Sequence, residues 1–330
     1  MSPAPIIEAT GLTVEFRGRM SLFTQRASVV QAVSNVDLLI RQGETLAVVG
    51  ESGCGKSTLG RALLRSTPIA AGRVMFRGTD ITWLKGRALR RARSQFQMIF
   101  QDPYASLNPK MRIFDTLAEP LRVHTNEPRA TISERVFQML ESAGLERSFA
   151  DRFPHEFSGG QRQRVAIARA AILHPDFIVA DEPLSALDVS LQLQILKLFA
   201  ELKRKFALTY LFISHDLARV FGFADRIAVM YLGKIVEVGP ALDVYRAPAH
   251  PYTRALIAAA PSPNPRAEAA RDAPPLYGEL PSPANPPAGC RFHTRCPMAI
   301  PVCSQVEPMM TAVGAGHHAA CHLLTPQVGG

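Results

Sequence analysis

Residues 46–58 of this 330-residue chain read Leu-Ala-Val-Val-Gly-Glu-Ser-Gly-Cys-Gly-Lys-Ser-Thr. The first four residues are a short, continuous apolar run, which is the pattern of a strand buried on both faces of a parallel sheet. A glycine-rich loop follows, and it leads into a helical stretch at residues 59–64. This order of strand, loop and helix is the setting that the pattern G-x-x-x-x-G-K-[ST] requires. We therefore predict that the loop binds nucleotide phosphates.

The residue types of the loop suit this chemistry. Glycines let backbone N–H groups close around phosphate oxygens, and the helix N-terminus adds a favourable dipole. Lys56 is expected to reach the β- and γ-phosphates of ATP, and Ser57 to ligate Mg²⁺. Cys54 is interpreted as structural, not nucleophilic, because it occupies a variable position of the loop. The predicted nucleotide-binding residues of the loop are Gly50, Glu51, Ser52, Gly53, Cys54, Gly55, Lys56, Ser57 and Thr58.

Apolar patterning elsewhere predicts the surrounding architecture. Residues 177–181 and 210–214 are further continuous apolar runs, typical of buried parallel strands. The first 40 residues instead alternate apolar and polar side chains, as antiparallel strands with one solvated face would. Between residues 101 and 175 the pattern is helical. The sequence thus predicts an α/β fold: a P-loop NTPase core with an N-terminal antiparallel β-subdomain and a helical insertion at about residues 102–175.

Composition constrains the class of protein only loosely. The 37 basic and 28 acidic residues give a formal charge of +9, which suits nucleic acid, anionic lipid or nucleotide equally well. No apolar stretch reaches the roughly 18 to 20 residues that span a bilayer. The N-terminus lacks a basic segment followed by an apolar one, so no secretory signal is indicated. We expect a cytoplasmic protein that does not itself cross the membrane.

Motifs further along the chain resemble the ABC ATPase family in content and order. Residues 157–161 (FSGGQ) resemble the signature sequence of the family, residues 177–183 its Walker B strand and residues 185–188 its D-loop. Gln101 looks like the Q-loop glutamine, and His215 like the switch histidine. The resemblance implies an ABC ATPase core that carries ATP and Mg²⁺.

The resemblance also implies catalytic roles. Asp181 ends a buried strand and would hold Mg²⁺, and Glu182 beside it would act as the general base for the attacking water. His215 would contact the γ-phosphate and position that water. Gln101 would respond to the γ-phosphate and Mg²⁺ and connect them to the helical insertion. We therefore predict Glu182, His215 and Gln101 as catalytic residues and Ser57, Gln101 and Asp181 as the magnesium site.

Two other nucleotide contacts are predicted. Phe16 is the candidate for the aromatic face that stacks on adenine, with Phe23 as the alternative. The signature offers a second set of backbone N–H groups at a helix start. In the ABC family two such domains pair head to tail, and each signature covers the ATP of the other domain. The signature residues expected to contact nucleotide are Ser158, Gly159, Gly160 and Gln161.

The C-terminal sequence resembles one class of importer. Residues 250–256 (HPYTRAL), the proline-rich stretch 261–287 and residues 290–297 (CRFHTRCP) resemble the C-terminal extension of di- and oligopeptide importer ATPases. Residues 102–109 and 179–188 look closer to the second ATPase of such systems. The resemblance implies a sibling ATPase, two permease subunits and an extracytoplasmic substrate-binding protein, with this chain peripheral at the cytoplasmic face of the inner membrane. Relatives that import nickel, glutathione or opines share the extension, so cargo and homodimer versus heterodimer stay open.

A soluble ABC ATPase acting on nucleic acid or ribosomes is the rival class, which the positive charge superficially favours. Translation-type members carry two nucleotide domains in one chain, and chromosome-type members split theirs with a long coiled coil. Neither feature is found in the sequence, and no nucleic-acid partner is expected. The predicted division is a nucleotide-binding domain at residues 1–256 and a proline-rich linker with the extension at residues 257–330.

Four cysteines gather in the extension with the spacing C-x5-C-x6-C-x17-C: Cys290, Cys296, Cys303 and Cys321. The segment is rich in proline and glycine and is predicted to need a staple. Disulfides are disfavoured in a reducing cytosol, whereas four thiolates suit Zn²⁺ or an iron–sulfur cluster. Resemblance to importer ATPases with such a cysteine set favours [4Fe-4S], with Zn²⁺ or no metal as alternatives. Nearby histidines that could replace a thiolate, or else be solvated, are His293, His317, His318 and His322.

Overall fold

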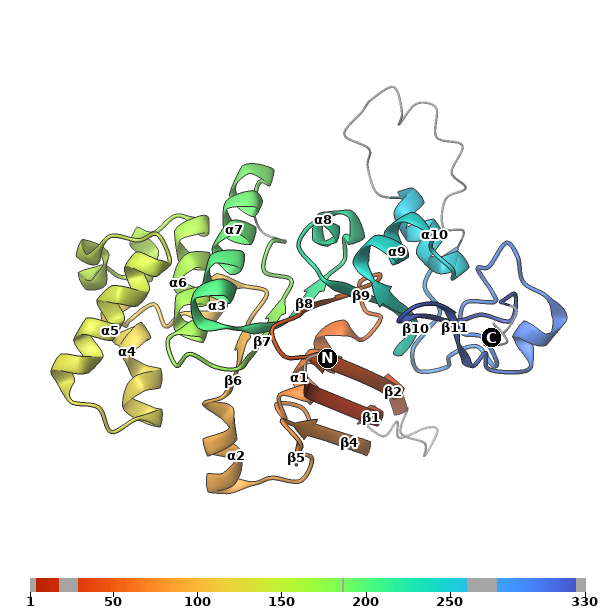
Figure 1. Cartoon of the computed structure of the whole chain (residues 1–330), viewed down its shortest axis with the longest axis horizontal. Coiled ribbons are helices and arrows are strands. Elements are labelled where there is room, and N and C mark those ends of the chain that lie inside the picture. Colours follow the sequence, from red (N-terminus) through yellow and green to blue (C-terminus); the bar gives the residue numbers. More distant parts are fainter. Residues whose placement is uncertain (1–3, 18–28, 186, 260–277, 325–330) are drawn as a thin grey trace, which may run out of the picture. The chain divides into compact units, whose positions relative to one another are not determined.

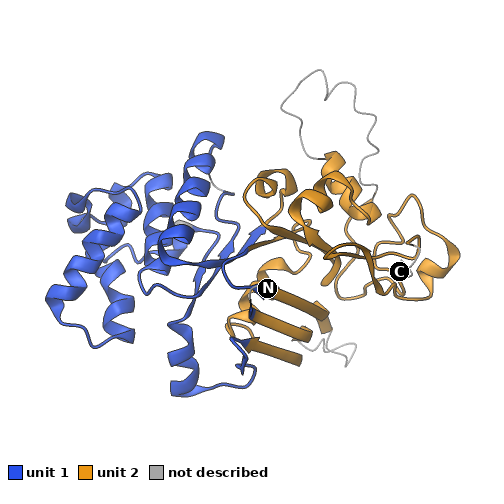
Figure 2. Ribbon diagram, viewed as in Figure 1, with its two compact units in different colours: residues 1–6, 40–44, 76–213 blue, residues 7–39, 45–75, 214–330 orange. Residues whose placement is uncertain are grey.

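The computed structural model describes residues 4–17, 29–185, 187–259 and 278–324. The chain divides into two compact units, each of which is described by itself (Figure 2). Unit 1 comprises residues 1–6, 40–44 and 76–213, and unit 2 comprises residues 7–39, 45–75 and 214–330. None of the described helices combines the length and the apolar character needed to span a bilayer.

The N-terminal strands form the predicted antiparallel β-subdomain. β1 (Pro5–Arg17) lies between β2 (Val29–Arg41) and β4 (Ala71–Phe76), and β5 (Thr79–Asp80) follows at the edge (Figure 1). The N–H of Gly11 donates to Asp37 at 2.7 Å, and the N–H of Asn35 donates to Thr13 at 3.0 Å. The partner number falls as the residue number rises, so β1 and β2 run antiparallel.

The central strands of unit 2 carry the nucleotide loop. β3 (Thr45–Val49) pairs in parallel with β9 (Arg226–Tyr231), and all five residues of β3 are buried, as its apolar run predicts. β10 (Lys234–Pro240) pairs antiparallel with β9 on its other side. The described α-helices of this unit are α1 (Lys56–Leu63), α8 (Leu217–Phe221), α9 (Ala241–Arg246) and α10 (Pro251–Ala259).

Unit 1 combines a parallel ladder with helices. β6 (Phe96–Ile99), β7 (Phe177–Asp181) and β8 (Thr209–Ser214) lie side by side, and β7 is parallel to both neighbours. Between β6 and β7 the chain forms only helices, because its apolar residues recur at helical spacing, as at Ile132, Val136 and Met139 of α5. The helices of unit 1 are α2 (Gly86–Arg93), α3 (Pro103–Ser106), α4 (Ile113–His124), α5 (Arg129–Ser142), η1 (Arg147–Asp151), η2 (Pro154–Glu156), α6 (Gly159–Ala171) and α7 (Val189–Phe206).

The C-terminal extension, residues 278–324, is packed into unit 2. β12 (His317–Ala320) pairs antiparallel with β10, and β11 (Met310–Gly314) pairs with β12; η3 (Pro301–Ser304) precedes them. Phe292 is 1% exposed, and its ring centroid lies 5.2 Å from that of Tyr231 and 5.3 Å from that of Tyr252. The extension therefore shares the core of unit 2, although its composition predicted that it needs a staple.

Candidate nucleotide site

The loop after β3 has the tight backbone that a phosphate cradle requires. Gly50 and Gly55 have φ angles of 155° and 108°, in the region that favours glycine. A Cβ atom would lie 2.2 Å from the carbonyl oxygen of Met230 at Gly50, and 2.1 Å from that of Ala32 at Gly55. Side chains are excluded at both positions, because the loop packs directly against the backbone of Met230 and Ala32. α1 begins directly afterwards at Lys56 and presents its N-terminus to the loop.

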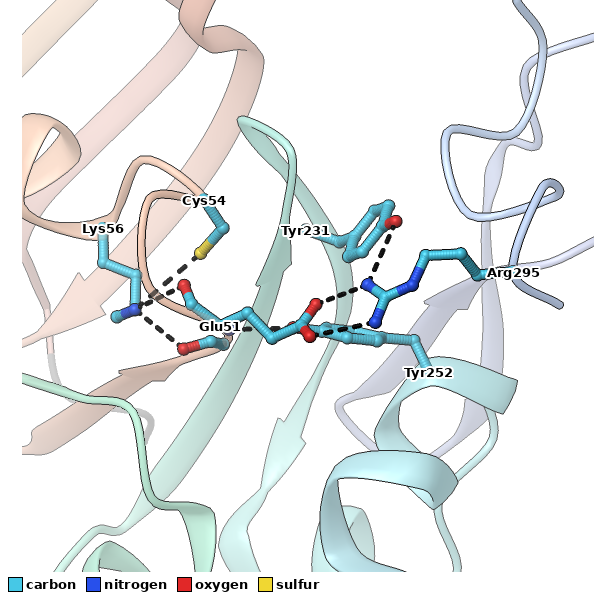
Figure 3. Close-up of polar contacts among 7 residues, drawn as sticks. Glu51, Cys54, Lys56, Tyr231, Tyr252 and Arg295 are labelled. Atoms are coloured by element: carbon cyan, nitrogen blue, oxygen red, sulfur yellow. Dashed lines mark hydrogen bonds and ion pairs between the residues drawn. The ribbon is translucent and has the colours of Figure 1, made fainter. Parts of the chain in front are cut away.

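Lys56 lies folded against the loop (Figure 3). Its ammonium group donates to the carbonyl oxygens of Gly50 at 2.7 Å and Glu51 at 2.9 Å, and lies 3.9 Å from Sγ of Cys54. Burial raises the pKa of the Cys54 thiol, although the charge of Lys56 opposes this shift. A thiol that stays protonated is a poor nucleophile, which supports a structural role for Cys54. Ser57 and Thr58 are half-buried in the first turn of α1, and Ser52 and Gly53 are exposed in the loop.

In unit 1, the end of β7 presents two carboxylates and an amide. Asp181 is the last residue of β7 and is 1% exposed. Glu182 follows with a φ of 46°, an uncommon value for a residue with a side chain, and its N–H donates to the carbonyl oxygen of Ile213 at 3.1 Å. Nε2 of Gln101 donates to Oε2 of Glu182 at 3.3 Å. The structure therefore brings together two residues predicted as catalytic from sequence positions far apart.

The signature residues begin helix α6. The hydroxyl group of Ser158 accepts a hydrogen bond from the N–H of Gln161 at 3.3 Å, and the Gln161 side chain accepts one from the N–H of Ser158 at 3.0 Å. This reciprocal capping box fixes the helix start. Ser158 is exposed and Gly159 is half-buried, so the N-terminus of α6 is accessible to a second molecule.

The remaining predicted residues are placed as follows. His215 lies exposed in unit 2, directly after β8, where a side chain can meet a ligand. Phe16, near the end of β1, is 46% exposed and so offers an aromatic surface. Phe23 lies outside the described residues. The roles assigned to these three side chains stay predictions.

One set of contacts at the loop was missed by sequence reasoning. Arg295 of the extension forms a two-pronged ion pair with Glu51, with N–O distances of 2.7 Å and 3.0 Å (Figure 3). The N–H of Glu51 donates to the hydroxyl oxygen of Tyr252 at 2.9 Å. An acidic residue at a variable position of a phosphate loop was the available signal, because it calls for a cation nearby.

A second buried pair joins the extension to β10. Glu237 accepts hydrogen bonds from the N–H groups of Ala249 and His250, both at 2.8 Å, and lies 2.7 Å from Nε2 of His317. Burial pushes the pKa of Glu237 upward, but these hydrogen bonds prevail and hold it below its usual value. Burial lowers the pKa of His250 to about 4. His317 is buried and paired with Glu237, so its interpretation as a solvated loop residue is wrong.

The prediction of an iron–sulfur cluster is also wrong. Among the residues that the structure describes, no group of three or more His, Cys, Asp or Glu side chains could hold a metal ion. Burial raises the pKa of Cys290 to about 11, and burial also raises the pKa values of Cys296 and Cys321. The aromatic core around Phe292 and the β10–β12 pairing hold the extension instead.

The sequence of this chain matches known families and proteins. Residues 33–185 match the ABC transporter family, and residues 236–303 match the family "Oligopeptide/dipeptide transporter, C-terminal region". The oligopeptide transport ATP-binding protein AppF of Bacillus subtilis is 48% identical over 96% of this chain and 97% of its own length. The protein OppF of Salmonella typhimurium, of the same description, is 48% identical over 95% of this chain and 94% of its own.

A solved structure shows the same fold. The dimeric ATP-binding cassette MJ0796, in a post-hydrolysis state bound to ADP and Pi, superposes with a TM-score of 0.64 at 27% identity, covering 71% of this chain and 98% of that one. This chain belongs to the ABC transporter family, among the ATP-binding proteins that carry the oligopeptide/dipeptide transporter C-terminal region.

Proposed function

We propose that this chain binds and hydrolyses ATP to energise an ABC importer of di- or oligopeptides. The observation that carries the proposal is the P-loop, in which Gly50 and Gly55 leave room only for backbone and Lys56 begins the following helix. The peptide cargo is supported by relatives at 47–48% identity that are named as oligopeptide or peptide import ATP-binding proteins.

The chain's own residues supply positioning and proton transfer. When bound, magnesium ATP supplies the phosphoanhydride bond that is cleaved. Lys56 would hold the β- and γ-phosphates, and Ser57 and Asp181 would hold the metal. Glu182 would accept a proton from the attacking water. Gln101 already donates a hydrogen bond to the Glu182 carboxylate, which holds this carboxylate in place at the end of β7.

Two copies of this kind of domain are proposed to complete each ATP site. The exposed start of α6 at Ser158 would cover the nucleotide of a sibling ATPase, and the sibling would do the same for this chain. Adenine would stack on Phe16, and His215 would position the attacking water. We further propose two permease subunits and an extracytoplasmic substrate-binding protein as partners, with the chain at the cytoplasmic face of the inner membrane. The nucleotide-binding domain is proposed to end near residue 256.

The substitution Glu182→Gln tests the catalytic assignment in the assembled transporter. The amide fills the same space but accepts no proton, so we expect ATP binding to persist and turnover to fall ~100-fold or more. Turnover is measured by phosphate release, and ATP binding by a fluorescent-ATP titration. Transport is measured by uptake of labelled dipeptide into proteoliposomes. Glu201→Gln, on the surface of α7, is the matched control and should keep full activity. Near-normal hydrolysis by Glu182→Gln would exclude Glu182 as the base.

A further inference from the structure

The C-terminal extension is bound directly to the phosphate loop. Arg295 is inserted between Glu51 and the ring of Tyr231, and its guanidinium carbon lies 5.9 Å from the ring centroid (Figure 3). Only 5% of the Arg295 side chain is exposed, against 26% for Glu51. A buried guanidinium that pairs with a half-buried carboxylate through two hydrogen bonds forms a geometrically specific contact, and removing one partner leaves the other charge uncompensated.

Glu51 holds three groups at once. Its side chain binds Arg295, its N–H donates to the Tyr252 hydroxyl oxygen at 2.9 Å, and its carbonyl oxygen accepts from Lys56 at 2.9 Å. The peptide unit before Glu51 is therefore held from outside the loop by Tyr252, and the peptide unit after Glu51 is held by Lys56 at the end of the loop. Since Lys56 contacts the same residue, a change at Arg295 reaches the lysine that is expected to meet the phosphates.

The negative charge of Glu51 explains why a cation is needed beside the loop. A carboxylate in a phosphate-binding loop repels the polyphosphate that the loop must hold. We propose that Arg295 of the C-terminal extension, together with Tyr252, positions the P-loop and neutralises Glu51, so that docking of the extension sets nucleotide affinity. Arg295 and Tyr252 are thus positioning residues. The inference rests on the proposed ATPase function, and it makes the extension a regulator of the nucleotide site.

The test compares Arg295→Met with the double variant Glu51→Gln plus Arg295→Met in the full-length chain. We expect Arg295→Met to weaken magnesium-ATP binding on the order of tenfold, the range of a typical coupling between sites. Magnesium-ADP binding should weaken less, because ADP carries one negative charge fewer. The double variant should recover most of the lost ATP affinity, because the uncompensated carboxylate is gone. Calorimetric titration measures the nucleotide affinities of the wild type, the single variant and the double variant. Thermal unfolding verifies that each variant is folded.

Controls separate this role from a general loss of structure. Glu307→Gln breaks another ion pair of the extension, with Lys234 of β10, and should leave ATP affinity unchanged. If Arg295→Met does not fold, Arg295→Lys keeps the charge but loses the two-pronged geometry, and intermediate ATP affinity is expected. Unchanged ATP affinity in Arg295→Met or Arg295→Lys, or no recovery in the double variant, would overturn the inference. Absence of ATP binding by the wild-type chain would overturn the proposed function with it.

Discussion

The ammonium group of Lys56 holds the phosphate loop in its conformation. Its ammonium group is 2.7 Å and 2.9 Å from the carbonyl oxygens of Gly50 and Glu51, so the loop is closed on itself by one cation. The residue is 4% exposed, which removes competing water from these contacts. Binding of a phosphate by Lys56 would exchange these two carbonyl partners for phosphate oxygens.

Replacing Lys56 by alanine removes that cation. We expect ATP affinity to fall roughly 10- to 100-fold, since a hydrogen bond to a charged group contributes about 1.5 to 3 kcal/mol. A fluorescent-ATP titration of the purified chain measures the change. Lys197→Ala, at an exposed position of α7, is the control that should bind ATP normally. Unchanged affinity in Lys56→Ala would contradict its assignment to the phosphates.

His250 is predicted to make folding sensitive to mild acid. Burial lowers its pKa from 6.5 to about 4, with Glu237 opposing the shift and Arg254 adding to it. Between pH 6.5 and 4 His250 is therefore protonated in the unfolded chain but neutral in the folded chain. The free energy of unfolding keeps its full value above pH 6.5 and falls by up to about 3 kcal/mol as the pH approaches 4. Urea unfolding of His250→Gln should show a shallower loss over this window, and His155→Gln, at an exposed position, should not. Identical pH profiles for His250→Gln and the wild type would refute this role.

At the scale of elements, the C-terminal extension is an added edge of the unit 2 sheet. β12 continues the ladder beyond β10, with Glu237 opposite Ala319 and Val238 opposite His318. The buried pair of Glu237 and His317 ties the same two strands through their side chains. Strand pairing supplies the backbone hydrogen bonds of an irregular segment, and the aromatic cluster beneath it supplies the apolar contacts. Together these contacts hold the extension in unit 2.

The aromatic cluster can be tested by one truncation. Phe292→Ala removes a buried ring that contacts Tyr231 and Tyr252, and a loss of about 3 to 5 kcal/mol of unfolding free energy is expected. Met309→Ala, at a position 84% exposed in the same extension, should change stability by less than about 0.5 kcal/mol. Urea denaturation followed by circular dichroism gives both values. Equal, small effects would mean that the extension adds nothing to the core of unit 2.

At the scale of the whole molecule, the chain is proposed to be half of an ATPase. The signature helix α6 begins at an exposed residue, Ser158, and is capped by its own Gln161, so it needs no other group of this chain to hold its N-terminus. A preformed, accessible helix start suits the nucleotide of a second subunit. ATP would then join the two subunits, and hydrolysis would release them.

The isolated chain is therefore expected to be a weak ATPase. Its specific activity should rise with protein concentration, because hydrolysis requires transient pairs, and should rise further when the sibling ATPase and permeases are added. Phosphate release measured over a dilution series, beside sedimentation velocity at the same concentrations, gives the comparison. Ser158→Arg, which blocks the signature, should abolish the concentration dependence. This proposal would be wrong if a demonstrated monomer hydrolysed ATP at the rate of the assembled transporter.

The sequence by itself determined the features that are local along the chain. The apolar run before Gly50, the helical spacing in α5 and the order of the motifs are short-range patterns, and they predicted the core, the β-subdomain and the residues of the P-loop. Only the tertiary structure decided that Arg295 meets Glu51, 244 residues away along the chain, and that the extension packs through Phe292. Periodicity reports which face of an element is buried but not which distant surface covers it, so the packing of Phe292 and the ion pair of Arg295 could not be read from the sequence.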